Sequence, residues 1–310
     1  MKNNHAPLFF LVILIFSIYS FCQTARVRGM GNVGYALSDD ESCLLFNPAG
    51  LGLINYRWNG GAVSYIPDVG GGFTRNFLSA AYQNDKLNMV GFSGYFYEIW
   101  DGMYQTSFGV GYRFLSNAII ENSLGLSMQY TLWNFNGKGG LQGANSVGGD
   151  LSGDIGYIIQ FIKRVRIGLV IKEIPLYNDQ NYLRYCLGIG YKDSFDGTTF
   201  RILDISTELG YVLRTFIDPN VNNRVFNNEL ITGFDLSFLK SFSARFGYYQ
   251  TNGYFSLSFG TGISFFNHFD IDIFIYRDGS EERWYTPSGI SFSFKRVLNW
   301  NKSDLKWMLK

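Results

Sequence analysis

The sequence predicts an all-β fold: a transmembrane antiparallel β-barrel of about fourteen strands with a short N-terminal helical plug. Segments in which apolar residues alternate with small or polar ones recur along most of the chain. Hydrophobic residues make up 46% and aromatic residues 18% of the chain, against 16% charged residues. Beyond the N-terminal stretch, no run approaches the roughly 20 consecutive apolar residues of a transmembrane helix. These observations favour strands, rather than helices, as the membrane-crossing elements.

The alternation locates the strands, because the side-chain period along a strand is two. It is clearest at residues 255–265, where phenylalanine, leucine and isoleucine alternate with serine and glycine. Residues 124–132 show the same pattern. On this basis we expect strands at residues 56–66, 73–83, 87–97, 104–114, 122–133, 149–161, 165–174, 182–192, 200–213, 225–238, 242–249, 254–265, 269–276 and 288–294.

The lengths of the connections favour an even number of strands. Outer-membrane barrels have short periplasmic turns and longer extracellular loops. Short connections fall at one end of the expected strands, at residues 84–86, 162–164, 239–241 and 266–268. Long connections fall at the opposite end, at residues 134–148, 215–224 and 277–287. Residues 115–121 and 193–199 form intermediate connections, and the short connection 251–253 lies at the wrong end for this scheme.

A soluble all-β fold is the alternative. Such a fold would carry Lys, Glu, Asp and Thr on the face that meets water, whereas here that face is largely Gly and Ser. Aromatic residues gather near the expected strand ends, as in residues 95–97, 130–135 and 248–249. Aromatic girdles at the two membrane interfaces explain this placement. We therefore favour the membrane barrel.

The first 22 residues have the features of a secretory signal peptide. Lys2 supplies the positive charge, an apolar stretch follows, and Ser20 and Cys22 are small residues before the expected cleavage site. Lipidation of Cys22 is an alternative, but Phe21 is bulky where a lipidation motif has a small residue. The chain is therefore expected to be exported.

The rest of the chain divides into a plug at residues 23–55, the barrel at 56–296 and a tail at 297–310. We expect the barrel in a bacterial outer membrane with both termini in the periplasm. The tail contains Trp300 and Trp307 among polar residues, and either docks on a partner or the inner leaflet or lies partly ordered over the barrel mouth. The mature chain then keeps Cys43 and Cys186, which we expect to be buried or lumenal thiols rather than a disulfide framework.

The plug segment contains start signals for two short helices. Ser38 and Glu41 have the spacing of a capping box, which predicts a helix through Leu45. Asn47 followed by Pro48 predicts a second start, because Asn caps well and Pro suits the first helical position. A compact piece of this size fits inside a barrel lumen.

Charged and polar residues on the small-residue faces of the strands are candidates for the lumen. Isolated charges in a crowded lumen are costly, so we expect these groups to pair with one another or with the plug rather than to form a substrate site. They are Arg113, Gln129, Asp154, Lys172, Arg184, Asp204, Glu208, Arg214, Asp235, Arg245, Asp270 and Asp272.

Residues 25–31 (ARVRGMG), 36–40 (ALSDD) and 46–51 (FNPAGL) resemble the opening of FadL-like outer-membrane proteins, in particular the PorV/PorQ branch of Bacteroidetes and their relatives. The last expected strand, with GISFSF at residues 289–294, is similar to the final strand of that branch. The resemblance implies fourteen strands and a lumenal hatch. The residues that carry it and the adjoining acidic cap are Gly29, Met30, Gly31, Ser38, Asp39, Asp40, Glu41, Asn47, Pro48, Ala49, Gly50 and Leu51.

The resemblance implies one of two roles: uptake of hydrophobic compounds by lateral diffusion, or service to type IX secretion. The chain is shorter than the fatty-acid transporters of this family, so their large extracellular loops are expected to be missing. It also continues past the last expected strand.

Enzymatic chemistry has little support in the residues. His5 falls in the signal peptide and His268 in a turn, so no catalytic Ser–His pair is available in the barrel. No His/Cys cluster has zinc spacing. Asp39 and its acidic neighbours suit helix capping better than cation binding. We expect no enzyme activity, no catalytic residue, no metal and no cofactor, and a net charge of +1 suggests no nucleic-acid partner.

Two function hypotheses follow. The first is transport of a small hydrophobic solute across the outer membrane, favoured by the hatch and by a glycine-rich wall where a kinked strand would open laterally. The second is a non-transporting subunit of a protein secretion system of the type IX kind, favoured by short loops, balanced lumenal charge and the tryptophan-bearing tail. The expected partners are outer-membrane lipid with a hydrophobic small molecule or with secretion-system proteins.

Overall fold

The computed structural model describes residues 29–39, 43–54, 58–64, 76–84, 90–100, 103–117, 119–136, 145–177, 183–196, 201–218, 223–239, 241–251, 254–265, 269–278 and 284–296. The expected signal peptide and C-terminal tail lie outside these residues, as do Asp40 and Glu41 of the expected capping box.

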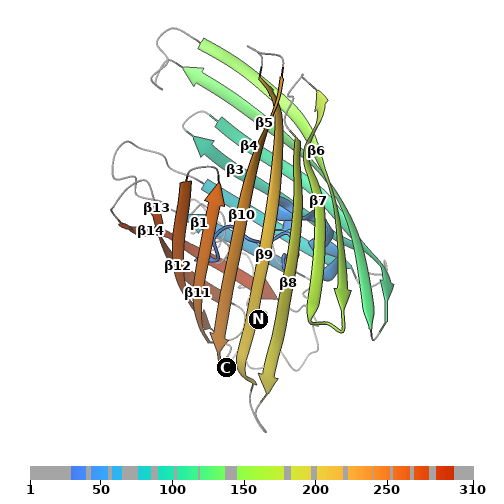
Figure 1. The fold of residues 1–310 in the computed structure, drawn as a ribbon, viewed down its shortest axis with the longest axis vertical. Helices are drawn as coiled ribbons and strands as arrows, with labels where there is room; N and C mark the ends of the chain where they lie inside the picture. Colours follow the sequence, from blue (N-terminus) through green and yellow to red (C-terminus); the bar gives the residue numbers. More distant parts are fainter. Residues whose placement is uncertain are drawn as a thin grey trace, which may run out of the picture.

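Within these ranges the chain forms fourteen antiparallel strands, which confirms the predicted fold class (Figure 1). The strands follow one another in sequence order around the barrel, and β1 pairs with both β2 and β14 to close it. They are β1 Trp58–Ser64, β2 Asn76–Asn84, β3 Val90–Trp100, β4 Met103–Ser116, β5 Ile120–Asn136, β6 Asn145–Phe161, β7 Val165–Tyr177, β8 Leu183–Asp196, β9 Arg201–Asp218, β10 Asn223–Phe238, β11 Phe242–Thr251, β12 Tyr254–Phe265, β13 Phe269–Asp278 and β14 Trp284–Arg296.

The two ends of the barrel differ in their connections. At the end where β1 begins and β14 finishes, the segments between strands are three to five residues long. We call this the turn end. At the opposite end, the loop end, they range from two to eleven residues. The uniformly short connections make the turn end the better match to a periplasmic face.

Exposure alternates along the strands as the sequence pattern predicts. On β5, Leu124, Leu126 and Met128 are exposed, whereas Ser123 and Ser127, at the alternate positions, are buried. Because every side chain on the outer face of a closed barrel meets lipid or interface, a band of exposed apolar side chains is what a membrane-spanning barrel requires. No helix among the described residues is long and apolar enough to cross a membrane.

Several strands extend beyond the predicted limits. β9 was expected to end at residue 213 and continues to Asp218, where it pairs with Asn223 of β10. Hydrophobicity marks only the band that meets lipid, but backbone N–H and C=O groups near the rim are still best satisfied by continuing the ladder. β14 extends through Pro287 into an expected loop, and the pairing of β13 with β14 shifts register there. A bulge is one of the few places where a sheet tolerates proline.

The connection from β6 to β7 has an unfavourable backbone geometry for its sequence. The amide of Arg164 donates to the carbonyl of Phe161 at 2.9 Å, which closes a four-residue turn. Its central residues, Ile162 and Lys163, have φ of 49° and 58°. Turns with two positive φ angles usually contain Asn-Gly, and a β-branched residue in this region is an outlier. The turn therefore stores strain.

Replacing the exposed Ile162 with asparagine, which tolerates positive φ, is expected to stabilise the protein. The expected gain in free energy of unfolding is about 1 kcal/mol, since the strain of one such residue is of that order. Urea unfolding in lipid vesicles, followed by tryptophan fluorescence, measures the change. Ile162→Val keeps the β-branch and serves as the control; equal stability of the two variants would contradict the strain.

Candidate functional site

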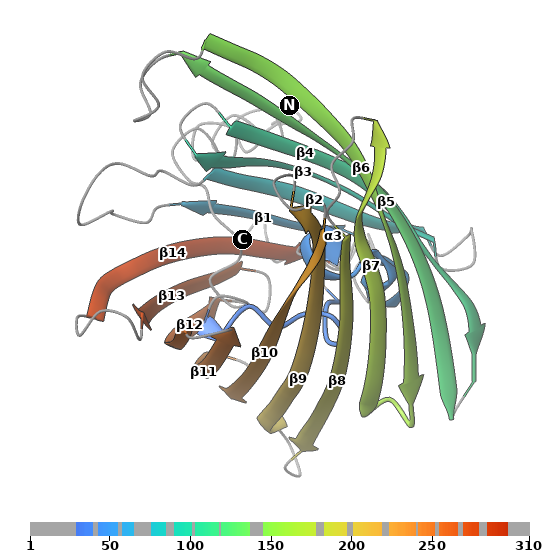
Figure 2. The same ribbon diagram turned by 45° about the horizontal axis from the view of Figure 1, so that its top comes forward.

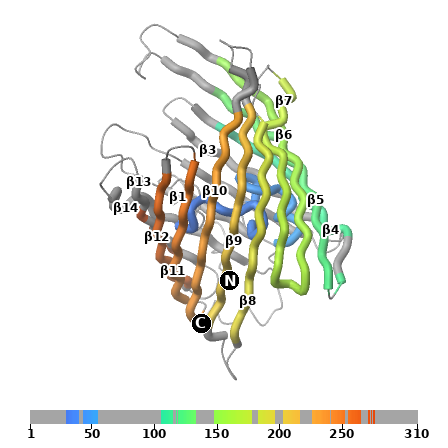
Figure 3. Tube along the Cα trace, viewed as in Figure 1, coloured from blue at the N-terminus to red at the C-terminus, as the bar shows by residue number. Residues whose placement is uncertain are grey.

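Residues 29–39 and 43–54 form a compact segment enclosed by the strands, which we call the plug (Figure 2). It contains a short helix, α3 (Cys43–Phe46), and a 3-10 helix, η1 (Pro48–Leu53), which contacts β2 to β6. Asn47 caps η1 as predicted: its side chain accepts from the amide of Ala49 at 3.0 Å, and Pro48 occupies the first turn. The blue trace of the plug crosses the interior in Figure 3.

Glycines of the wall make room for the backbone of the plug. A Cβ atom added at Gly125 would overlap the backbone of Pro48 and Ala49, and one at Gly168 would overlap the carbonyl of Tyr35. The sequence alone favours a glycine-rich wall in which a kinked strand opens. The structure shows a more direct role, since a side chain at either position would push the plug away from the strands.

Polar groups of the wall bind the backbone of the plug. The buried carboxylate of Glu208 accepts from the amides of Tyr35, Ala36 and Leu37 at 2.7 to 2.9 Å. In the other direction, Lys172 Nζ donates to the carbonyl of Leu45, a residue of α3, at 2.6 Å. Backbone groups that leave water need partners, and these contacts supply them.

The capping box expected at Ser38 and Glu41 lies partly outside the described residues. The Ser38 Oγ atom is buried without a hydrogen-bond partner, and the described helix begins at Cys43. Asp39, expected at the start of that helix, instead pairs with Arg166 of β7 at 3.0 Å and Lys192 of β8 at 3.1 Å. Nearby cations on the wall provide a stronger partner for a buried carboxylate than local amides alone.

Most of the lumenal candidates lie at inward strand positions. Arg113 pairs with Glu121, Asp154 with Lys172, Arg184 with Glu173, Arg214 with Glu229, and Asp235 with Arg245. The Gln129 amide donates to Asp154 Oδ1 at 2.9 Å, and Asp204 is half-buried on β9. The side chains of Asp270 and Asp272 lie outside the described residues.

Several charged residues that face the lumen were not among the candidates named from the sequence. Arg166 and Lys192 lie at positions of their strands that face the lumen, so the alternation of side chains alone could have identified them. Glu173 could not be found in this way, because it lies at a β-bulge. Lys172 and Glu173 together face Asp154, whose Oδ1 atom accepts from the amide of Glu173 at 2.9 Å. Glu173 has a φ of 61°, and the ladder between β6 and β7 is interrupted there.

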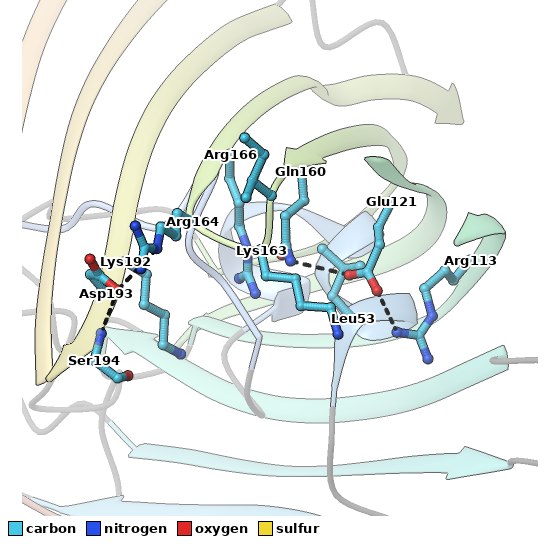
Figure 4. Close-up of a pocket in the computed structure, with 11 residues that line it drawn as sticks. Leu53, Arg113, Glu121, Gln160, Lys163, Arg164, Arg166, Lys192, Asp193 and Ser194 are labelled. Atoms are coloured by element: carbon cyan, nitrogen blue, oxygen red, sulfur yellow. Dashed lines mark hydrogen bonds and ion pairs between the residues drawn. The ribbon is translucent and has the colours of Figure 1, made fainter. Parts of the chain in front are cut away.

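A pocket of about 370 Å³ opens at the turn end, beside the plug residue Leu53 (Figure 4). Its polar lining comes from the ends of β4 to β8 and from the strained turn: Arg113, Glu121, Gln160, Lys163, Arg164, Arg166, Lys192, Asp193 and Ser194. Among the described residues, no group of three or more His, Cys, Asp or Glu side chains has the arrangement of a metal site. Cys43 and Cys186 are free, buried thiols.

The close contacts between glycines of the wall and the plug backbone suggest a way to displace the plug. Gly125→Ala is expected to expose Cys43 of the plug, which is now fully buried, to a water-soluble thiol reagent. Accommodating a methyl group in a packed contact costs about 1–3 kcal/mol, enough to raise the labelling rate several-fold. The measurement uses mature chain carrying Cys186→Ser. Gly153→Ala is the control, because its added Cβ would lie 3.3 Å or more from other atoms; equal labelling of both variants would rule out the close packing.

Comparison with known proteins places this architecture among solved outer-membrane structures. No family model and no curated protein matches the chain. The toluene transporter TodX of P. putida has a TM-score of 0.57 at 10% identity, covering 90% of this chain and 99% of that one. The toluene transporter TbuX of Ralstonia pickettii has a TM-score of 0.53 at 14% identity, covering 91% and 100%. The outer membrane protein Omp33 of Acinetobacter baumannii has a TM-score of 0.52 at 9% identity, covering 77% and 98%. At these identities the likeness shows a shared fold: this chain has the barrel architecture of bacterial outer-membrane hydrocarbon transporters.

Proposed function

We propose that this chain passes a small hydrophobic solute across a bacterial outer membrane, with the plug as its gate. The observation that carries the proposal is the likeness to two toluene transporters over nearly the whole of each chain. The proposal places the turn end and both termini in the periplasm, with residues 1–22 as the export signal and 297–310 as a periplasmic tail. The short connections at the turn end support this orientation.

The interior supports an apolar solute. Met30, Val33 and Phe46 of the plug pack with Val170 and Ile231 of the wall in one buried apolar cluster. An apolar molecule that replaced such contacts would leave no polar group without a partner, whereas the charged groups nearby already have partners within the lumen. The seam between plug and wall is therefore the easiest place for a hydrophobic solute to enter.

The β-bulge between β6 and β7 is the proposed point of exit from the lumen. An interrupted ladder has fewer inter-strand hydrogen bonds to break, so the two strands separate there at lower cost than along a continuous ladder. Asp154, Lys172 and Glu173 surround the interruption, and the exposed Leu176 lies on the outer face beside it. A solute that left at this point would enter the membrane laterally.

The alternative is a non-transporting subunit of a secretion system of the type IX, PorV-like kind. Its support is the resemblance in the plug motif, and the close fit between plug and wall is compatible with it. This role requires a stoichiometric protein partner and no solute passage. A pull-down of tagged chain from outer membranes in mild detergent, with mass spectrometry of proteins and lipids, tells the two roles apart.

Uptake of radiolabelled toluene by cells that produce the chain tests the transport proposal. We expect uptake several-fold above that of cells with an empty vector. Deleting Glu173 removes the extra residue of the bulge and is expected to return uptake to the vector level, because a continuous ladder between β6 and β7 resists opening.

Arg184→Gln is the matched control, since it breaks the pair between Arg184 and Glu173 but keeps the bulge. It is expected to retain uptake. Vector-level uptake by the unmodified chain, together with a co-purified partner, would replace transport with the secretion role. Uptake that survives the deletion would instead place the exit elsewhere.

A further inference from the structure

The turn-end pocket has an excess of positive charge. Five cationic side chains line it, and among the described residues only three carboxylates face or pair with them: Glu121, Asp193 and, from the plug, Asp39. Arg113 and Glu121 form one pair at 3.7 Å, and Arg164 and Asp193 form another at 3.2 Å. Of the remaining cations, Arg166 and Lys192 both pair with Asp39, and none of the described carboxylates forms an ion pair with Lys163.

That one carboxylate shows what the pocket can bind. A single oxygen of Asp39 receives both Arg166 Nη1 and Lys192 Nζ. Arg166 is held in place by a second contact, in which its Nε donates to Gln160 Oε1. A guanidinium fixed in this way is a preorganised oxyanion site, because planar Arg donors match carboxylate and phosphate oxygens. The protein thus fills the site with its own side chain.

Lys163 is the second independent sign of a ligand. Its side chain reaches across the pocket toward Leu53 and Arg113 in Figure 4, and none of the described carboxylates forms an ion pair with it. The backbone that presents it is strained, with φ of 58° at a position where glycine is usual. Strain concentrated at one residue is more often associated with function than with stability.

We propose that this pocket binds a small phosphate-bearing anion, which contacts Lys163 and competes with Asp39 for Arg166 and Lys192. A phosphate group carries enough charge and oxygens to engage several cations at once, and a pocket of about 370 Å³ accepts a small organic phosphate. Binding would release Asp39 and so loosen the plug at the turn end. The inference concerns a site separate from the apolar seam and does not depend on which solute the barrel passes.

Calorimetric titration of the full chain with inorganic phosphate, in a neutral phosphate-free detergent, tests the site. We expect saturable binding that weakens with salt. Lys163→Gln removes the positive charge but keeps a polar side chain, and is expected to weaken binding about tenfold, as loss of one charged contact implies. Arg214→Gln, at a lumenal arginine outside the pocket, is the control and should bind phosphate as the unmodified chain does.

A second test uses the competition between phosphate and Asp39 for Arg166 and Lys192. Asp39→Asn is expected to bind phosphate about tenfold more tightly, because the internal carboxylate no longer competes for the two cations. A variant that merely damaged the plug would not gain affinity. In mature chain carrying Cys186→Ser, phosphate should also raise the labelling rate of Cys43 several-fold, whereas chloride at the same ionic strength should not.

The source of the phosphate is resolved by the choice of probe. Binding of inorganic phosphate and glycerol 3-phosphate indicates a soluble ligand, whereas binding of short-chain phosphatidic acid alone indicates a lipid headgroup. No saturable binding of any of the three probes to the unmodified chain, or an affinity unchanged in both Lys163→Gln and Asp39→Asn, would overturn the proposal.

Discussion

The interior depends on one constraint: a segment of irregular backbone has left water and must find a partner for each of its polar groups. Regular secondary structure supplies few of them, since α3 and η1 together span ten residues. The wall supplies several others. Glu208 takes three consecutive amides, Ser123 donates to the carbonyl of Ala49 at 2.6 Å, and Ser258 donates to the carbonyl of Gly29 at 3.2 Å. Glycines of the wall let the strands that carry these partners approach the plug backbone closely.

This constraint explains the composition of the inward faces. A wall that binds backbone needs small residues at the contacts and a few long polar residues between them, which is the mixture of Gly, Ser and scattered charge seen along the strands. The charges do not form a pore of one sign. They form pairs such as Asp154 with Lys172 and Asp235 with Arg245, and Arg166 and Lys192 pair with the plug itself.

The barrel could be predicted because its signals are local and repeated. Period-two alternation located all fourteen strands, and β12 matched at both ends, because one face of a barrel strand is apolar and the other small or polar. The plug contacts could not be predicted in this way. Local spacing favours a capping role for Asp39, whereas in the structure Asp39 lies beside two cations that are distant along the chain and near in space. The bulge at Glu173 was also invisible, since the sequence there reads as an ordinary strand.

The closure of the barrel has a consequence for how the molecule assembles. The final seam joins Trp58 of β1 to Arg296 of β14, two positions at opposite ends of the barrel sequence. The plug precedes β1 in the chain, yet its anchors, such as Glu208 and Ser258, lie on strands that are synthesised much later. Long-range pairings of this kind form slowly. The plug can therefore be bound in full only after these late strands have joined the sheet.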